Sequence, residues 1–299
     1  MDTRITNAFT IDVEDYFQVS AFDTCIDRSA WCRMECRIGK NLDNVLALLD
    51  QTHTRATFFV LAWIAEQYPD TVRRIAAAGH EIASHGYDHR RVTEMTVSQI
   101  REDIVRSAGI LQDLSGQAVR GYRAPSFSVC RTNLWIHDLL LEAGYEYSSS
   151  IYPIHHDHYG IPESDRFCWR SRSGLLEIPL TSMRLSSANW PAAGGGYFRL
   201  LPYRTSRGMI SFVNRVDGQP TVFYCHPWEI DPEQPRIREA GMKSRFRHYL
   251  NLDRTANRLS RLLRDFSWDR IDQVFASQLA TAEPAVGAAP VKSEHLYAA

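Results

Sequence analysis

The sequence predicts an α/β fold built around a parallel sheet that closes, or nearly closes, into a barrel. Short runs of β-branched or aromatic residues alternate with longer helical patterns along most of the chain. Repeated βα units of this kind are typical of a parallel sheet with helices packed outside it. Charged and polar residues directly follow several of the predicted strands. In barrel enzymes this carboxyl edge of the strands holds the active site.

The first half of the chain alternates between strands and helices. Residues 8–13 are a β-branched run, and residues 57–61 are a continuous apolar run that indicates a strand covered on both faces. Between them, residues 42–49 carry apolar side chains at helical spacing. Pro69 at its start and Gly79 just past its end bound the next helix. The same criteria predict strands at 80–85, 119–123 and 145–147 and helices at 97–114 and 134–143.

The second half is predicted to complete a single barrel domain over residues 1–280. Strands are expected at 175–180 and 221–225. Residues 152–220 are rich in Pro, Gly and Ser, and we expect an insertion-like elaboration on the barrel there. A C-terminal helical extension is predicted at 243–270, including a long amphipathic helix from 250 to 266. Residues 281–299 lack periodicity and are predicted to be a disordered tail.

Composition narrows the class of protein. The 299 residues include 34 basic and 35 acidic side chains, and the net charge of -1 gives no electrostatic case for nucleic-acid or anionic-membrane binding. No apolar run approaches the ~20 residues of a membrane span. The first seven residues lack the apolar segment of a secretory signal, so we expect a cytoplasmic protein with its six cysteines reduced. The oligomeric state stays open, a homo-oligomer included.

Two motifs offer metal ligands. The first, Asp12-Val13-Glu14-Asp15, ends the first strand, and the second, His85-Gly86-Tyr87-Asp88-His89, follows a later one. Each has an ordinary interpretation by itself: acids at a solvated strand edge, and a histidine pair that occurs by chance. Together, one carboxylate and two histidines would hold a metal and leave positions open for water and a substrate oxygen.

Two further strand ends carry polar residues of other kinds. Arg123 begins an Arg-Ala-Pro-Ser-Phe segment, and His226 begins a His-Pro-Trp-Glu segment. An arginine at this edge is a natural partner for the carboxylates of the first motif. A spare carboxylate, the arginine and the last histidine are the base, the group that holds the base, and the acid that metal-assisted hydrolysis needs.

In this order, the motifs resemble those of the NodB-homology polysaccharide deacetylases, carbohydrate esterase family four. The resemblance covers about residues 8–226 and implies a distorted (β/α) barrel of the NodB-homology type with a C-terminal elaboration. The first motif departs from the commoner Thr-Phe-Asp-Asp pattern and is closer to the branch of allantoinase-like and Helicobacter-type peptidoglycan deacetylases. Residues 184–203, 226–236 and 244–252 are similar to a subfamily found in exopolysaccharide loci with exosortase systems.

The resemblance implies a role for each motif residue. Asp12 matches the general base, Arg123 the arginine that holds it, and His226 the general acid; we expect the Arg123 guanidinium to bind Asp12 bidentately. His85 and His89 match the metal ligands.

The acidic metal ligand is either Glu14 or Asp15. Alternation along the strand places Glu14 on the same face as Asp12, which favours Glu14. Asp15 would take its place if the chain has already turned out of the strand.

The remaining site candidates concern the substrate and the metal. Pro125, Ser126 and Phe127 are expected beside the substrate, with a backbone N–H of Ser126 or Phe127 holding the oxyanion. Trp228 is expected to stack on a sugar. The divalent ion is expected to be zinc, although cobalt, nickel and manganese also suit such a ligand set.

Two other segments are given structural interpretations. His155-His156-Asp157-His158 is metal-like in composition but is expected to form a solvated loop or part of the substrate rim. Gly194-Gly195-Gly196 lacks the Lys-Ser/Thr of a phosphate loop, so a tight turn or a flexible lid is expected.

The predicted function is a metal-dependent hydrolase of carbon–nitrogen bonds other than peptide bonds. It would remove N-acetyl groups from an amino-sugar-containing polysaccharide or glycan precursor. Two alternatives are allantoinase-like hydrolysis of a small cyclic amide and a barrel that binds saccharides without catalysis.

Overall fold

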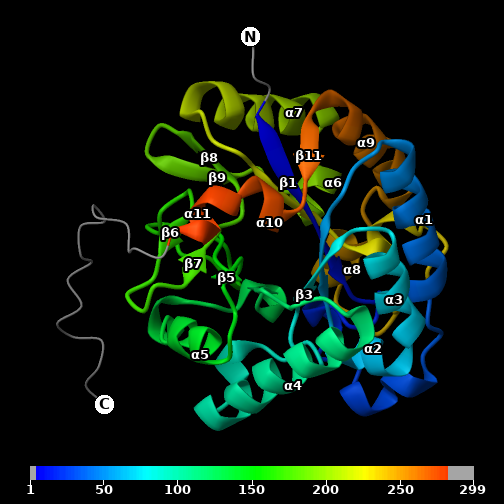
Figure 1. Ribbon diagram of the computed structural model, residues 1–299. Helices are drawn as coiled ribbons and strands as arrows, with labels where there is room; N and C mark the ends of the chain where they lie inside the picture. The colour runs from blue at the N-terminus through cyan, green and yellow to red at the C-terminus, as the bar shows by residue number, and fades with distance from the viewer. Residues whose placement is uncertain (1–4, 282–299) are drawn as a thin grey trace.

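The computed structural model describes residues 5–281, which fold around a curled, nine-stranded sheet (Figure 1). Its strand order is β10-β1-β2-β3-β4-β5-β7-β6, and β11 also pairs with β1. Pairing is parallel throughout except between β6 and β7. The strands of both sheets are β1 (Thr6–Val13), β2 (Thr57–Val60), β3 (Glu81–Ser84), β4 (Gly121–Tyr122), β5 (Tyr147–Ser148), β6 (Trp169–Arg170), β7 (Leu176–Glu177), β8 (Ser182–Leu185), β9 (Ala188–Pro191), β10 (Val222–Cys225) and β11 (Ser267–Asp269).

Helices cover the outer side of the sheet, as the βα alternation predicts (Figure 1). Five of them, α1 to α5, lie in the first half of the chain and pack around β1 to β5. The helices are α1 (Ile38–Gln51), α2 (Ala62–Gln67), α3 (Pro69–Ala77), α4 (Val97–Ser115), α5 (Ile136–Glu142), α6 (Gly195–Leu200), α7 (Tyr203–Phe212), α8 (Met242–Tyr249), α9 (Leu252–Asp265), α10 (Ile271–Val274) and α11 (Ala276–Ala280).

β1 and β2 form the middle of the core. All but the first residue of β1 and all four residues of β2 are buried, because each strand has neighbours on both sides and helices or side chains on both faces. This is the environment that the apolar run at 57–61 predicts. Registered pairing of Val13 with Val60, and of Val60 with Ser84, brings the carboxyl ends of β1, β2 and β3 to one edge.

The predicted closure of the barrel is achieved by irregular backbone rather than by a strand. The sheet path ends at β10 on one side and at β6 and β7 on the other. Between β7 and β10, the amide of Val222 donates to Thr181 Oγ1 at 2.6 Å, and the amide of Tyr224 donates to the carbonyl of Ala193 at 2.6 Å. These bonds satisfy the inner edge of β10, so the sheet curls nearly into a ring.

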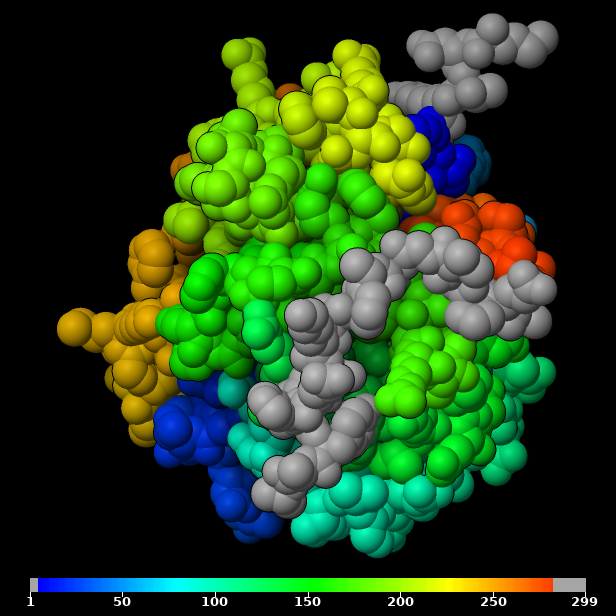
Figure 2. Space-filling model, turned by 90° about the vertical axis from the view of Figure 1, so that its left-hand side faces the viewer, coloured from blue at the N-terminus to red at the C-terminus, as the bar shows by residue number. Residues whose placement is uncertain are grey.

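The stretch from 152 to 220 lies against this open side of the sheet. It contributes β6 and β7 to the main sheet, the separate β8–β9 hairpin, and helices α6 and α7. Seen from the side, this stretch, in green to yellow, covers much of the molecule (Figure 2).

The glycine run of this stretch, residues 194–196, passes close to the backbone of β10. Gly194 has a φ of 118°, and a Cβ there would lie 2.1 Å from the carbonyl oxygen of Tyr224. Only glycine fits such an approach. The run therefore packs closely against β10 and leads directly into α6, so it is neither a lid nor the expected tight turn.

The C-terminal extension returns the chain to the sheet. α9 buries one apolar side, including Leu259, Leu262 and Leu263, and β11 then pairs with the beginning of β1. The predicted tail lies outside the described residues apart from its first residue, and the predicted domain boundaries stay a prediction. No helix between residues 5 and 281 is long and apolar enough to cross a membrane.

Candidate active site and metal centre

Four strand ends deliver the predicted motifs to one place. β1 ends at Val13, β3 at Ser84, β4 at Tyr122 and β10 at Cys225, and each of the four motifs lies at or directly after one of these ends. Because the four strands are parallel and belong to one curled sheet, their carboxyl ends surround a single site.

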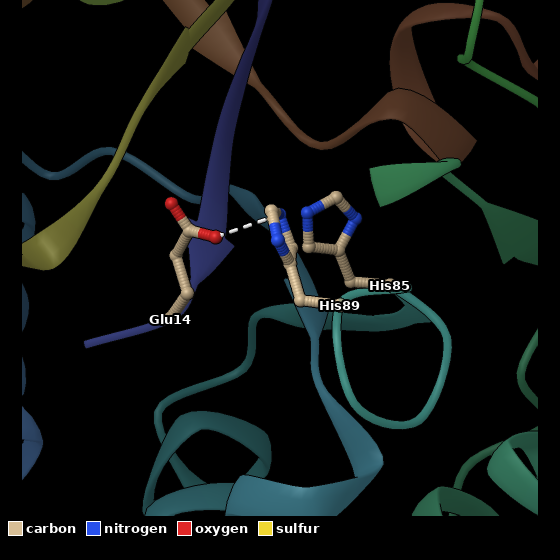
Figure 3. A group of neighbouring side chains, drawn as sticks. All are labelled: Glu14, His85 and His89. Carbon is tan, nitrogen blue, oxygen red and sulfur yellow. Dashed lines mark ion pairs between the residues drawn. The ribbon is translucent and has the colours of Figure 1, made fainter. Parts of the chain in front are cut away.

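Glu14, His85 and His89 form a compact group at this edge. One ligand atom from each lies within 4.8 Å of the other two, and all three side chains are buried. Glu14 comes from the end of β1 and the histidines from the loop after β3, and their side chains point toward one another (Figure 3). Glu14 Oε2 lies 2.9 Å from His89 Nε2. One carboxylate oxygen and two imidazole nitrogens are donors that suit a divalent transition metal.

The orientation of His85 is fixed by the backbone of Arg123. His85 Nδ1 lies 2.8 Å from the Arg123 carbonyl oxygen, which can only accept, so the proton is on Nδ1 and the Nε2 lone pair is free. Burial lowers the pKa of His85 to about 4, so the ring is neutral at pH 7. A neutral, oriented imidazole is the form that binds a metal.

The loop that carries His89 is held in a constrained conformation. His89 itself has a φ of 57°, and Gly86 has a φ of 74°. Arg28 fixes the loop by donating from Nε to the carbonyl of Asp88 and from Nη2 to that of His89. Residues held in a left-handed conformation by their surroundings are common at ligand-binding sites.

One buried oxygen of the group fits a bound cation. Among residues 5–281, Glu14 Oε2 is buried, makes no hydrogen bond and lies 2.9 Å from His89 Nε2. Burial raises the pKa of Glu14, but the three histidines His89, His226 and His85 outweigh it and hold that pKa below its ordinary value, so the carboxylate is ionised. A buried anion with an unused oxygen is costly unless a cation accompanies it.

Asp15 points away from this group. Its carboxylate accepts backbone N–H bonds from Tyr16 at 2.8 Å, Arg37 at 2.6 Å and Ile38 at 3.1 Å. These bonds fix the chain at the beginning of α1, where amides would otherwise lack partners. Of the two acidic candidates, the structure brings only Glu14 to the histidines.

The two acids should therefore differ in metal binding. We expect Glu14→Ala to lose most of the bound metal, because one of three ligands is gone. Asp15→Ala should keep the metal and lower the melting temperature, because it removes the carboxylate that binds the amides at the start of α1. Elemental analysis and thermal unfolding of both variants check this. The reverse pattern of metal content would identify Asp15 as the ligand.

Asp12 lies beside the metal group and is held by a fully buried arginine. Arg123 Nη1 donates to Asp12 Oδ1 at 2.6 Å. The expected bidentate contact is absent, because the other guanidinium N–H groups donate to Ser149 and Thr10. One oxygen of Asp12, Oδ2, is thus left to face His226, whose Nε2 is 3.9 Å away.

Arg123→Lys should distinguish the effect of the positive charge of Arg123 from the effect of its hydrogen-bond geometry. A lysine keeps the positive charge but cannot donate to Asp12, Thr10 and Ser149 at once. We expect metal binding to be retained and kcat to fall at least about tenfold, with KM little changed, because the arginine positions Asp12 and lies beneath the site. Steady-state kinetics on the metal-loaded variant give the split, and a wild-type kcat would make Arg123 a structural counterion only.

His226 completes the site from the far side. Its Nε2 lies 3.4 Å from Glu14 Oε1, and its Nδ1 donates to Glu229 Oε1 at 2.5 Å. Glu229 in turn accepts from Arg199 Nε at 2.9 Å. Burial lowers the pKa of His226, but the carboxylates of Glu14, Glu229 and Asp12 raise it to about 9.

Two regions of the chain match families of known proteins. Residues 21–148 match the family described as "Polysaccharide deacetylase", and residues 149–276 match the family described as "Domain of unknown function (DUF3473)". The chain contains a polysaccharide deacetylase domain of the NodB type.

Curated relatives match part of this domain. The chain is 31% identical over 116 residues to a peptidoglycan deacetylase from Helicobacter pylori, a match that covers 39% of this chain and 38% of that protein. It is 34% identical over 90 residues to a peptidoglycan-N-acetylglucosamine deacetylase from Bacillus cereus, covering 30% and 33%. The chain thus spans a little over a third of the first relative's length and a third of the second's.

A crystal structure shows the same fold over nearly the whole chain. It is of a Mycobacterium smegmatis protein described as a polysaccharide deacetylase, with a TM-score of 0.61 and 19% identity over 97% of this chain and 96% of that one. The predicted NodB-type (β/α) barrel is therefore confirmed.

The candidate site of the deacetylase domain crosses the boundary between the two matched families. The paired histidines and Arg123 lie within 21–148, whereas the carboxylates of β1 precede it. His226 and Glu229 belong to residues 149–276. The second matched region therefore contributes directly to the candidate site of the first.

Sequence reasoning missed Glu229 and Arg199, which position His226. Glu229 had a local signal, since it follows His226 by three residues in one short turn. Arg199 lies in α6 and had none, because only the folded chain brings α6 beneath that turn.

Glu229→Gln should weaken any reaction in which His226 is the general acid. The amide cannot hold the imidazolium as a carboxylate does, so the pKa of His226 should fall. A general acid works while protonated, and activity should then be lost at lower pH than in the wild type. We expect a fall in kcat of about 10- to 100-fold at pH 8. A pH–rate profile measures the shift, and an unmoved alkaline limb would contradict it.

Trp228 does not have the predicted role in the deacetylase site. Only 4% of the residue is exposed, and its ring stacks on His226 at 5.0 Å and on His248 at 4.1 Å. Its Nε1 donates to Glu14 Oε1 at 3.2 Å. The indole is thus a buried support for Glu14 and His226 and offers no face to a sugar.

The loop after β4 lies beside the site. Pro125 and Phe127 are buried, Pro125 lies against Gly86, and Ser126 is half-buried with its hydroxyl 2.6 Å from that of Ser20. The Phe127 amide already donates to the carbonyl of Ala124, which leaves that of Ser126 as the candidate oxyanion donor. Both residues have φ values near 50° (Ser126 54°, Phe127 50°), so the turn that carries this amide is strained.

The histidine-rich segment belongs to the rim and not to a metal group. His156 stacks on Tyr159 at 3.8 Å, and Asp157 pairs with Lys243 at 2.6 Å and Arg247 at 3.3 Å. Tyr159 also packs against Phe127 at 5.5 Å. The loop therefore links the substrate side of the site to α8.

Proposed function

We propose that the protein is a metal-dependent hydrolase that removes N-acetyl groups from an amino-sugar-containing polysaccharide or glycan precursor. The curated relatives, a peptidoglycan deacetylase and a peptidoglycan-N-acetylglucosamine deacetylase, support the N-acetyl group as the target. The resemblance of residues 184–203 and 226–236 to exosortase-associated deacetylases supports an exopolysaccharide as the substrate.

One observation carries the proposal. A three-residue metal group lies beside both a carboxylate held by a buried arginine and a histidine held by a buried carboxylate. Amide hydrolysis needs an acceptor for the proton of the attacking water and a donor for the departing amine. Asp12 and His226 offer these two functions with 3.9 Å between Oδ2 and Nε2.

Each protein group has one role in the proposed reaction. Asp12 takes a proton from the water that attacks the acetyl carbonyl carbon, and its free Oδ2 is the oxygen available for it. The Ser126 amide donates to the developing oxyanion. His226 donates its Nε2 proton to the amine nitrogen as the carbon–nitrogen bond breaks, giving acetate and a free amino sugar.

Glu14, His85 and His89 would hold the divalent ion. We expect zinc, with cobalt, nickel or manganese as substitutes for this ligand set. Such an ion polarises a carbonyl group and makes water a better nucleophile at neutral pH.

Acetate release is the direct test. Protein loaded with zinc is incubated with N-acetylglucosamine oligomers, peptidoglycan fragments, an N-acetylated exopolysaccharide and allantoin as a small cyclic amide. We expect acetate from at least one saccharide, with His85→Ala as the inactive control. Turnover of allantoin alone would favour the cyclic-amide alternative, and no turnover of any substrate by folded, metal-loaded protein would overturn the proposal.

A further inference from the structure

α8 lies directly beside the candidate active site. Its His248 is buried and stacks on Trp228 at 4.1 Å, and Trp228 stacks on His226 at 5.0 Å. On its other side, His248 packs on Phe22 at 4.7 Å. The inner face of α8 is thus anchored next to the candidate acid. The outer face, in gold to orange, projects at the left-hand edge of Figure 2.

The outer face of α8 exposes two large apolar side chains. Met242 is 87% exposed and Phe246 is 60% exposed. Met242 is the most exposed large hydrophobic residue in the described part of the chain. The two are four residues apart on one helix and therefore lie side by side. Single exposed apolar residues are common, whereas two adjacent ones on a projecting helix form a small apolar patch.

Exposed basic residues flank this apolar pair in the sequence. Between residues 236 and 247 the chain has five basic side chains and one acidic side chain, Glu239. The basic residues, all exposed, are Arg236, Arg238, Lys243, Arg245 and Arg247. The chain as a whole carries a net charge of -1, so this concentration of positive charge is local. The net charge of the whole chain gives no reason to expect anionic-membrane binding, because it does not reveal this local excess of basic residues.

We propose that residues 236–247 dock the protein, beside its candidate active site, on an anionic phospholipid membrane. Short helices that lie in a membrane interface bring apolar side chains into the acyl boundary and basic side chains to the headgroups. Each basic residue close to an anionic surface strengthens binding roughly fivefold. With two apolar side chains and five cations, two of them paired with Asp157, the docking is reversible and sensitive to salt.

An acidic glycan fits this surface less well. Carbohydrate recognition uses flat aromatic faces and convergent hydrogen bonds, whereas Met242 is a flexible aliphatic chain at the most exposed point of the helix. Two of the cations, Lys243 and Arg247, are also engaged with Asp157. The apolar pair is the feature that a membrane explains and a soluble polyanion does not.

Vesicle sedimentation of the full chain tests the proposal without any substrate. Vesicles of phosphatidylcholine alone are compared with vesicles in which about a third of the lipid is phosphatidylglycerol. We expect binding to the anionic vesicles only, weakening as salt is raised. Two double variants, Met242→Ser with Phe246→Ser and Arg238→Glu with Arg245→Glu, should each bind roughly tenfold more weakly or worse.

The matched control lies at the other end of the strands. Arg215 and Val216 are an exposed basic residue and a 66% exposed apolar residue just before β10 begins. Arg215→Glu with Val216→Ser makes the same kinds of change and should bind like the wild type. Acetate release by all variants is measured separately, so a failure of the proposed catalytic function does not affect the vesicle result.

Three results would overturn the membrane proposal. They are no binding to anionic vesicles, equal binding to neutral ones, and undiminished binding by both double variants of residues 236–247. Binding of a soluble acidic polysaccharide without binding of vesicles also overturns it and assigns the cations to an acidic glycan.

Discussion

Replacing His85 with alanine is expected to abolish both metal binding and deacetylation while leaving the chain folded. His85 supplies one of three ligand atoms that lie within 4.8 Å of one another, and two ligands do not hold a divalent ion firmly. Loss of even an outer partner of a metal ligand costs about 10- to 100-fold in affinity or activity, so loss of a ligand should exceed about hundredfold. His89→Ala should behave in the same way.

The matched control for both variants is His158→Ala. This histidine lies in the exposed rim loop, with 54% of its side chain exposed, and takes no part in the metal group. Elemental analysis, acetate release and thermal unfolding are measured on all three proteins. Full metal occupancy in both His85→Ala and His89→Ala would show that the ion, if bound, sits elsewhere.

The sequence was most informative where a strand ends in polar residues. A buried strand has a strong pattern, as at Thr57–Val60, and parallel strands place their ends at one edge whatever the details of packing. This is why Asp12, His85 and Arg123 could be assigned to one site from residues far apart in the chain. Alternation along β1 also favoured Glu14, which the structure brings to the histidines.

Features that depend on tertiary packing could not be predicted. The sequence shows Trp228 two residues after His226 but not that the two rings stack, or that His248 covers the indole from α8. Arg199 likewise reaches Glu229 from α6, which begins just after Gly194 passes close to β10. These contacts are set by side chains from three separate segments.

Local patterns also failed in the region between β5 and β10. Helix α7 and the β8–β9 hairpin were not predicted, because Pro, Gly and Ser obscure the periodicity there. The same irregularity has a structural function, since Thr181 and Ala193 satisfy the inner edge of β10 where a regular strand is missing. A backbone that closes a barrel without a strand carries no strand pattern.

Asp12→Asn is expected to keep the metal and lose the rate. Asparagine has nearly the same shape, and its carbonyl oxygen can still accept from Arg123 Nη1, where the aspartate accepts at 2.6 Å. It cannot take a proton from water at neutral pH. Removal of a general base typically costs about 10²- to 10⁴-fold, and the loss should be in kcat because the metal group is intact.

The buried arginine complicates this experiment in a way that can be measured. Asp12→Asn removes the counter-charge of Arg123, and an unpaired buried charge costs about 3–5 kcal/mol of stability. A lower melting temperature is therefore expected alongside the lower rate, and the two effects must be separated. Thr10→Val provides the control, since Thr10 Oγ1 accepts from the same Arg123 Nη1 at 2.8 Å but has no proton-transfer function.

If Asp12 is the base, the two variants should differ in kcat. Thr10→Val should lose stability with kcat within about tenfold of the wild type, because Asp12 is still present and still held. Asp12→Asn should be at least about a hundredfold slower at temperatures where it is fully folded and its zinc content is unchanged. Equal rates for the two variants would mean that both act through the position of Arg123. The proton acceptor would then have to be sought in Glu14, the other carboxylate near His226 Nε2.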